Sequence, residues 1–168
     1  MQATRTYLEL LTPDAFEPAF GEFPGLAVRP VPDPTPELYR RCYRTVGDGF
    51  HWRDRWDWTD DRIRAHLGQP EITLYTALEH GALVGWYELR RVPDDGSVEI
   101  AYFGLVPGAL GRGLGKDLLS CAVRDAWALG AARVWLHTCT LDHPHALPNY
   151  RARGFTPYHS EHYEVALP

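Results

Sequence analysis

The sequence predicts a mixed α/β (α+β) fold in a single domain that covers residues 1–168. Segments with strand character and segments with helical periodicity alternate irregularly along the chain, and two helical segments precede a hairpin. A regular strand–helix–strand repeat is therefore not expected. A chain of 168 residues, 45% of them hydrophobic, can bury about two-thirds of its unfolded surface in one core.

The first 24 residues are expected to form an N-terminal extension whose apolar run, residues 6–11, adds an edge strand to the sheet. The first core strand is expected at residues 25–31, and a proline-rich linker follows it. This linker ends in a helix start, with Thr35 as the N-cap and Pro36 at the first helical position. The two helices expected next cover residues 37–46 and 59–67.

The middle of the chain is expected to form a meander of strands. The tetrapeptide Pro-Asp-Asp-Gly at residues 93–96 favours a turn, so it is expected to join two strands in a hairpin. Gly104, inside the second strand of this hairpin, indicates a β-bulge. The three expected strands cover residues 72–78, 83–92 and 98–107.

The last third of the chain alternates between helix and strand. Leucines and alanines at helical spacing predict a long helix over residues 113–129, which Gly130 ends. A strand is expected at residues 134–141. A short helix that carries Tyr150 follows, and Gly154 ends it before a final strand.

Three glycines at alternate positions, Gly111, Gly113 and Gly115, stand at the expected start of the long helix. Glycine tolerates positive φ and has no Cβ, so backbone amides can approach a ligand closely. The helix start adds unpaired N–H groups and the positive end of the helix dipole. Together these features predict a binding site for a phosphate group.

Two common phosphate-binding motifs do not fit this segment. A P-loop that ends at Gly115-Lys116 would need glycine at Leu110 and serine or threonine at Asp117. A dinucleotide fingerprint would need glycine at Lys116 in one register or at Leu118 in the other. Neither motif is therefore present.

The hexapeptide at residues 110–115, Leu-Gly-Arg-Gly-Leu-Gly, resembles the pyrophosphate loop of the GNAT superfamily of acyl-CoA-dependent N-acetyltransferases, Gln/Arg-x-x-Gly-x-Gly/Ala. Leu110 departs from the pattern at its first position. A glycine-rich turn that only caps the helix is the alternative interpretation of this motif alone.

A second motif, Asn-Tyr-Arg-Ala-Arg-Gly-Phe at residues 149–155, resembles the Tyr-x-x-x-Gly-Phe ending of the same superfamily. The preceding loop departs from the pattern, because residues 142–145 lack the usual asparagine. The resemblance covers about residues 72–155. It implies a GNAT-like fold, with a central mixed, mostly antiparallel sheet flanked by helices.

The resemblance implies acetyl-CoA as cosubstrate and a primary amine of a small molecule or a peptide as acceptor. Tyr150 would stand beside the coenzyme sulfur and donate a proton to the leaving thiolate. Glu99 would be the base, with Glu88 and His137 in reserve; a surface or hairpin-pairing role for Glu99 has equal weight. The residues implied in coenzyme binding are Leu105, Val106, Leu110, Gly111, Arg112, Gly113, Leu114, Gly115 and Lys116.

The segment Gly-Phe-His-Trp-Arg-Asp-Arg-Trp-Asp-Trp at residues 49–58 contains three of the six tryptophans. In the superfamily the corresponding segment lines the acceptor site, so Trp52, Trp56 and Glu88 are placed among the substrate-binding residues, with Asp54 and Asp57 able to hold a cationic amine. The alternative is a packed helix junction in which the neighbouring arginines pair with acids. The tryptophans could equally form a homodimer contact.

Composition excludes several other classes of protein. The net charge of −5 disfavours a nucleic-acid partner. No apolar run is long enough to cross a bilayer, and the first residues do not resemble a signal peptide, so we expect a cytoplasmic protein without a membrane partner.

The cysteines and histidines predict neither disulfides nor a metal site. The three cysteines, Cys42, Cys121 and Cys139, are odd in number and widely spaced, which fits a reducing compartment. His137, Cys139, His143 and His145 lack the ligand spacing of a zinc site, so no metal is expected. The competing functions are a coenzyme-binding sensor, a catalytically idle relative and an interaction module that kept only the fold.

Overall fold

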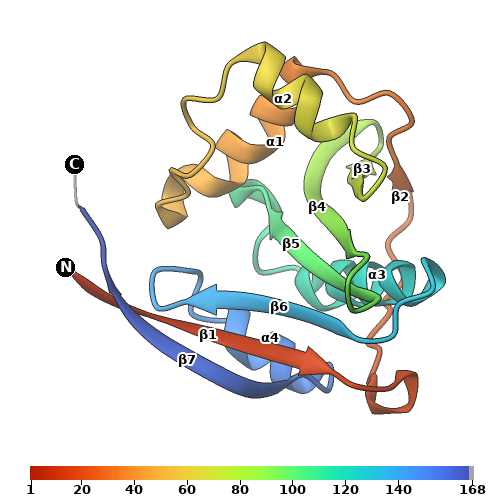
Figure 1. The fold of residues 1–168 in the computed structure, drawn as a ribbon. Helices are drawn as coiled ribbons and strands as arrows, with labels where there is room; N and C mark the ends of the chain where they lie inside the picture. Colours follow the sequence, from red (N-terminus) through yellow and green to blue (C-terminus); the bar gives the residue numbers. More distant parts are fainter. Residues whose placement is uncertain (167–168) are drawn as a thin grey trace.

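The computed structural model describes residues 1–166, which form one seven-stranded sheet and four α-helices (Figure 1). The strand order is β2-β3-β4-β5-β6-β1-β7, and every neighbouring pair is antiparallel except β5 and β6. This mixed, mostly antiparallel sheet confirms the predicted fold class. The strands are β1 (Gln2–Leu10), β2 (Leu26–Pro30), β3 (Ile72–Glu79), β4 (Ala82–Val92), β5 (Ser97–Leu105), β6 (Val134–Cys139) and β7 (Thr156–Glu164), and the helices are α1 (Pro36–Gly47), α2 (Asp60–Leu67), α3 (Leu114–Ala128) and α4 (Ala146–Ala152).

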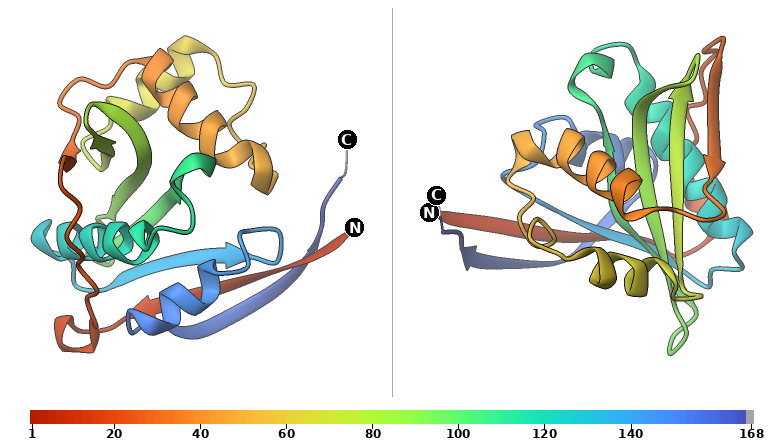
Figure 2. Two further views of the ribbon diagram at one scale, coloured as in Figure 1. Left: turned by 180° about the vertical axis from the view of Figure 1, so that it is seen from behind. Right: turned by 90° about the horizontal axis from the view of Figure 1, so that it is seen from above.

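The helices cover the sheet on both faces, with α1 and α2 on one face and α3 on the other (Figure 2). Two hydrophobic clusters correspond to these faces. One contains Tyr39, Tyr43 and Trp86 under α1, and the larger one lies under α3. The expected cap of α1 is confirmed, since the Thr35 side chain accepts a hydrogen bond from the Leu38 N–H.

The N-terminal strand β1 lies inside the sheet, between β6 and β7. Tyr7 stands opposite His137 on one side and His159 on the other. The edge position expected for this strand is occupied by β7 instead. Leu8 and Leu10 are fully buried, as befits a strand with a neighbour on each side.

The irregularity of β5 lies at Ala101 and not at Gly104, where it was expected. Glu88 stands opposite Tyr102, but the next residue of β4, Leu89, stands opposite Ile100, so Ala101 is the extra residue. Because of this extra residue, Glu99 and Tyr102 lie on the same face of the sheet.

Gly104 has a different role, because a Cβ there would lie 2.3 Å from Cγ1 of Val46. The glycine lets α1 approach the sheet.

The parallel pair β5 and β6 is short, with only Val98–Val134 and Glu99–Trp135 in register. Beyond these pairs the two strands separate, although each runs on for several residues. The separation opens the sheet beside the start of α3.

Candidate active site

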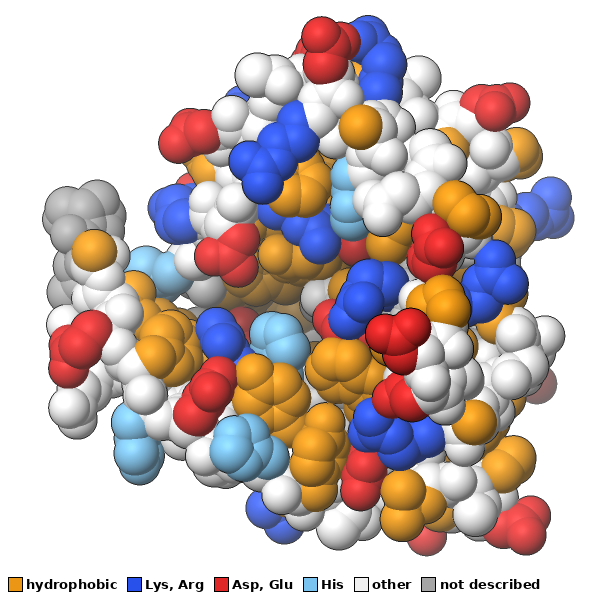
Figure 3. Space-filling view, viewed as in Figure 1, with side chains coloured by type: hydrophobic (Ala, Val, Ile, Leu, Met, Phe, Trp, Pro, Cys, Tyr) orange, Lys and Arg blue, Asp and Glu red, His pale blue; other side chains and the backbone are white. Residues whose placement is uncertain are grey.

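A cavity of about 1350 Å³ lies where β5 and β6 separate. At one end it is lined by the start of α3. At the other end it is lined by residues 50–55, which follow α1, and by residues of β1 and β7. Figure 3 shows this hollow, with hydrophobic side chains on its floor and charged side chains around it. The cavity thus joins the two regions that the sequence assigned to coenzyme and acceptor.

The glycine-rich loop forms the α3 end of the cavity. Gly111 and Gly113 have φ values of 77° and 79°, and Gly113 is the N-cap of α3. A Cβ on Gly111 would meet no atom within 4 Å, so it would project into open space. This open cradle of backbone N–H groups suits the pyrophosphate of a coenzyme A derivative.

Six of the nine residues implied in coenzyme binding line the cavity, and three do not. Arg112 instead forms an ion pair with Glu79, with nitrogen–oxygen distances of 2.8 and 2.7 Å, so its charge is compensated on the outer surface. Leu114 is buried in the core under α3, and Val106 packs against both hydrophobic clusters. The six that line the cavity are Leu105, Leu110, Gly111, Gly113, Gly115 and Lys116.

Tyr150 faces the cavity from α4 and is 7% exposed. Its ring contacts Phe103 of β5 and Phe155. The preceding residue, Asn149, donates a hydrogen bond from Nδ2 to the Gly115 carbonyl at 3.2 Å, which ties α4 to α3. Burial raises the pKa of Tyr150, and the charge of Asp142 raises it further. The hydroxyl therefore keeps its proton at neutral pH.

Glu99 lines the same cavity from β5 and is 8% exposed. Its Oε2 atom accepts a hydrogen bond from Nη2 of Arg90 at 2.7 Å. Sequence reasoning missed Arg90, although counting back from the four-residue turn at 93–96 places it directly opposite Glu99. The arginine orients the carboxylate.

His137 of β6 also lines the cavity, and its ring contacts Tyr7. Burial lowers its pKa, although the charge of Glu99 opposes the decrease. His137 is therefore neutral at neutral pH. It lines the same cavity as Glu99.

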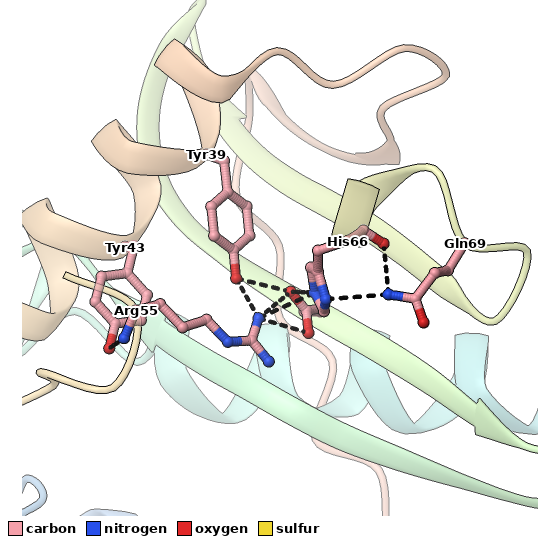
Figure 4. A network of polar contacts seen from close by, with 6 residues as sticks. Tyr39, Tyr43, Arg55, His66 and Gln69 are labelled. Carbon is pink, nitrogen blue, oxygen red and sulfur yellow. Dashed lines mark hydrogen bonds and ion pairs between the residues drawn. The ribbon is translucent and has the colours of Figure 1, made fainter. Parts of the chain in front are cut away.

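Glu88 does not line the cavity, because its side chain is fully buried under α1 and α2. Its carboxylate accepts hydrogen bonds from Arg55 at 2.9 Å, Tyr39 at 3.0 Å and His66 Nε2 at 3.1 Å. Figure 4 shows Tyr39, Arg55 and His66 converging on this point. Burial alone would raise the pKa of Glu88, but His66 and Arg55 outweigh it and hold the pKa below its ordinary value. Glu88 thus anchors the segment that carries Arg55.

The tryptophan-rich segment has features of both an acceptor-site wall and a packed helix junction. Trp52 lines the cavity, as the acceptor-site interpretation requires. Trp56 does not, and lies under the guanidinium groups of Arg44 and Arg53. The arginines of the segment pair with acids, as the helix-junction interpretation requires.

Three observations bear on the classes considered from the sequence. Cys42, Cys121 and Cys139 are free thiols. Within residues 1–166, no group of three or more histidine, cysteine or acidic side chains is arranged to hold a metal ion. None of the helices in that range is both long and apolar enough to cross a bilayer.

Comparison with protein families decides the assignment: the profile of the acetyltransferase (GNAT) family matches residues 33–155. The chain belongs to this family. The assignment supports an acyltransferase. A comparison with curated proteins found no match.

Solved structures share the GNAT fold. A GCN5-related N-acetyltransferase from Sphaerobacter thermophilus superimposes with a TM-score of 0.67 at 22% identity, over 94% of this chain and 49% of that one. A GCN5-related N-acetyltransferase from Kribbella flavida gives 0.66 at 21% identity, over 95% and 56%. The present chain thus spans about half the length of these two proteins.

A neighbour of similar size is an aminoglycoside acetyltransferase from an uncultured soil metagenomic sample, in complex with sisomicin. Its TM-score is 0.69 at 15% identity, over 86% of this chain and 97% of that one. At these identities the likeness establishes the fold alone.

Proposed function

We propose that this GNAT protein transfers an acetyl group from acetyl-CoA to a primary amine of a small molecule or a peptide. The observation that carries the proposal is one cavity with a glycine-rich helix start at one end and Tyr150 and Glu99 on its walls. Acetyl-CoA would supply the activated thioester. The backbone N–H groups of residues 111–116 would hold its pyrophosphate, and the Lys116 ammonium would add positive charge.

The acceptor must lose a proton before it can attack, because an alkyl ammonium has a reference pKa of about 10.4. Glu99, oriented by Arg90, accepts this proton directly or through water. The free amine attacks the thioester carbonyl, a C–N bond forms, and the C–S bond breaks. The attacking nitrogen then loses its second proton to water. Tyr150 donates its hydroxyl proton to the departing sulfur and is reprotonated from solvent.

The negative charge that develops on the carbonyl oxygen needs a donor nearby. A backbone N–H at the bulge of β5 is the candidate, and the bulge residue Ala101 lines the cavity. No covalent intermediate with the protein is required, so Cys139 need not act as a nucleophile.

Isothermal titration with acetyl-CoA and with CoA tests the coenzyme site. Gly115 has an ordinary helical φ, and its Cβ position has only van der Waals contacts, so Gly115→Glu adds a charged side chain to the cavity without backbone strain. We expect micromolar binding to the wild type and none to this variant. Gly108→Glu is the matched control, because Gly108 is exposed, unstrained and outside the cavity. Failure of the wild type to bind either ligand would refute the proposal.

The second candidate is a protein that binds acyl-CoA without turnover. It is favoured by one observation, the ion pair that keeps Glu99 occupied with Arg90. Release of CoA thiol, measured with a panel of amines, separates the two functions. Turnover that exceeds the rate of acetyl-CoA hydrolysis supports the transferase, and binding without turnover supports the sensor.

A further inference from the structure

In the tryptophan-rich segment that follows α1, residues 49–58, both arginines form ion pairs. Arg55 pairs with Glu88 at 2.9 Å, and Arg53 lies 3.6 Å from Asp48. Two of its three tryptophans are covered by guanidinium groups, Trp56 by Arg44 and Arg53, and Trp58 by Arg55 and Arg62. These contacts hold the segment in place and leave their members unavailable to a ligand.

Asp54, Asp57 and Trp52 do not take part in these contacts, and of the three Asp54 and Trp52 line the cavity. Among residues 1–166, Asp54 forms no ion pair or side-chain hydrogen bond, and no guanidinium lies over Trp52. Trp52 is instead held edge-on against Trp86 and Tyr102, with ring centroids 6.1 and 4.9 Å away. A carboxylate without an ion-pair partner and an indole held in place by its aromatic neighbours therefore both line the cavity.

The carboxylate of Asp54 acts across the cavity floor. Burial raises the pKa of Tyr102 on β5, and the charge of Asp54 adds to the increase. On β6, burial lowers the pKa of His137, and the charge of Asp54 opposes the decrease. The charge of Asp54 thus makes a small contribution to both shifts, while burial makes the largest.

The arginines at this end of the cavity do not compensate Asp54, because each is already paired. Arg5 bonds Glu161 at 2.9 Å and Arg90 bonds Glu99 at 2.7 Å, while Arg53 and Arg55 are paired as described above. The Lys116 ammonium lies at the opposite, α3 end. The cavity thus has an uncompensated negative charge at its acceptor end.

We propose that the acceptor is a diamine or polyamine-like molecule, whose second cationic group binds to Asp54 and Trp52 while its other amine is acetylated. This inference rests on the proposed function, since it names the class of acceptor for the same cavity. A carboxylate gives charge-assisted hydrogen bonds to an ammonium, and an indole face attracts a cation. A monoamine whose nitrogen lies at the acetylation position has no second cation to make either contact.

The test compares α,ω-diamines of three to eight carbons with n-alkylamines of the same lengths. Binding is measured by titration to the free protein and to the protein loaded with CoA, which lacks an acetyl group and so permits no reaction. We expect the best diamine to bind at least about tenfold more tightly than its monoamine, a difference of about 1.4 kcal/mol.

Asp54→Asn should abolish this preference, because the second ammonium of the diamine loses its carboxylate partner. Asp57→Asn is the matched control, because Asp57 is an exposed acid of the same segment that does not line the cavity, and it should keep the preference. Equal binding of diamines and monoamines to the wild type, or equal losses in the two variants, would overturn the inference.

The experiments distinguish failure of the proposed transferase function from failure of the proposed diamine acceptor. Loss of CoA binding bears on the proposed function, while the titration of the free protein still decides the role of Asp54. Turnover of monoamines as fast as diamines would leave the transferase standing and refute only the acceptor class.

Discussion

The hydroxyl of Tyr150 differs from those of two nearby tyrosines in its hydrogen bonding. Other tyrosines near the cavity are engaged, since Tyr39 donates to Glu88 and the Tyr43 hydroxyl accepts the Arg55 N–H. Among the residues that the structure describes, the Tyr150 hydroxyl has no hydrogen-bond partner, yet it borders the cavity. A protonated and unengaged hydroxyl is suited to donate a proton.

Tyr150→Phe should lower kcat by about 10²- to 10⁴-fold, because the leaving sulfur loses its proton donor. The affinity for acetyl-CoA should be unchanged, since the ring and its contacts remain. Steady-state kinetics and isothermal titration measure the two quantities. Tyr158→Phe is the control, as Tyr158 is exposed and lies outside the cavity. An unaltered kcat in the Tyr150 variant would contradict the proposed role as proton donor.

Glu88 should make stability depend on pH in the acid range. Its folded pKa is lowered, so it stabilises the fold above the unfolded value of about 4.3, and this contribution is lost as the pH falls further through the folded pKa. Glu88→Gln leaves Arg55 without its partner and should cost about 3–5 kcal/mol at pH 7. Urea unfolding at several pH values measures both effects.

The variant should also lack this part of the pH dependence. Glu22→Gln provides the comparison, because Glu22 is exposed and lies outside the network around Arg55. Identical acid profiles for the wild type and the Glu88 variant would show that the carboxylate is not held below its ordinary pKa.

Helix α1 and strand β5 approach each other only because position 104 lacks a side chain. Gly104→Ala places a methyl group 2.3 Å from Cγ1 of Val46 and should destabilise the fold by about 1–3 kcal/mol. The double variant with Val46→Ala should recover part of this loss, since the clashing group is removed. Thermal or urea unfolding of the single and double variants measures the coupling. Purely additive losses would exclude this contact as the cause.

Elements whose signals are local could be predicted from the sequence, and those set by distant pairing could not. The Thr35 cap, the hairpin at residues 93–96 and the start of α3 each depend on a few adjacent residues, and each lies where expected. The bulge was misplaced because glycine signals both irregular strands and close approach, and only the packing of Val46 distinguishes them.

The candidate site shows the same division. The glycine loop and Tyr150 carry sequence motifs, and the structure places them on one cavity. The burial of Glu88 had no local signal. The sequence around a glutamate in a strand is the same whether its side chain faces solvent or pairs with a distant arginine, here Arg55. The engagement of Arg112 with Glu79 was hidden for the same reason, as 33 residues separate the two.

At the scale of the whole molecule, β1 connects the edge strand β7 to the rest of the sheet. It pairs with β6 along one edge and with β7 along the other. The position of β1 could not be read from its own residues, because the number of neighbours a strand has is decided by chain segments far away in sequence.

Thr6→Pro should therefore disturb both neighbours of β1, since Thr6 stands opposite Thr138 and Ser160. Amide hydrogen exchange should accelerate in β6 and β7 and change less in β3 and β4. Ser160→Pro in β7 is the comparison, because within residues 1–166 β7 pairs only with β1. Protection should then be lost in β7 and in the β1 amides that face it, and kept in β6. Uniform acceleration in all strands would show that the sheet opens as one unit.

The position of β1 between β6 and β7 also affects folding during synthesis on the ribosome. Thr6 and Ser160 are 154 positions apart, so a ribosome that adds about 5–20 residues per second needs about 8–30 s between them. Throughout that interval β1 exists without the strand that will flank it on the outside, and its leucines have no finished core to enter. Pairings of such long sequence separation also slow folding. The unpaired edge of β1 and its exposed leucines are therefore expected to make the nascent chain prone to aggregation until β7 emerges.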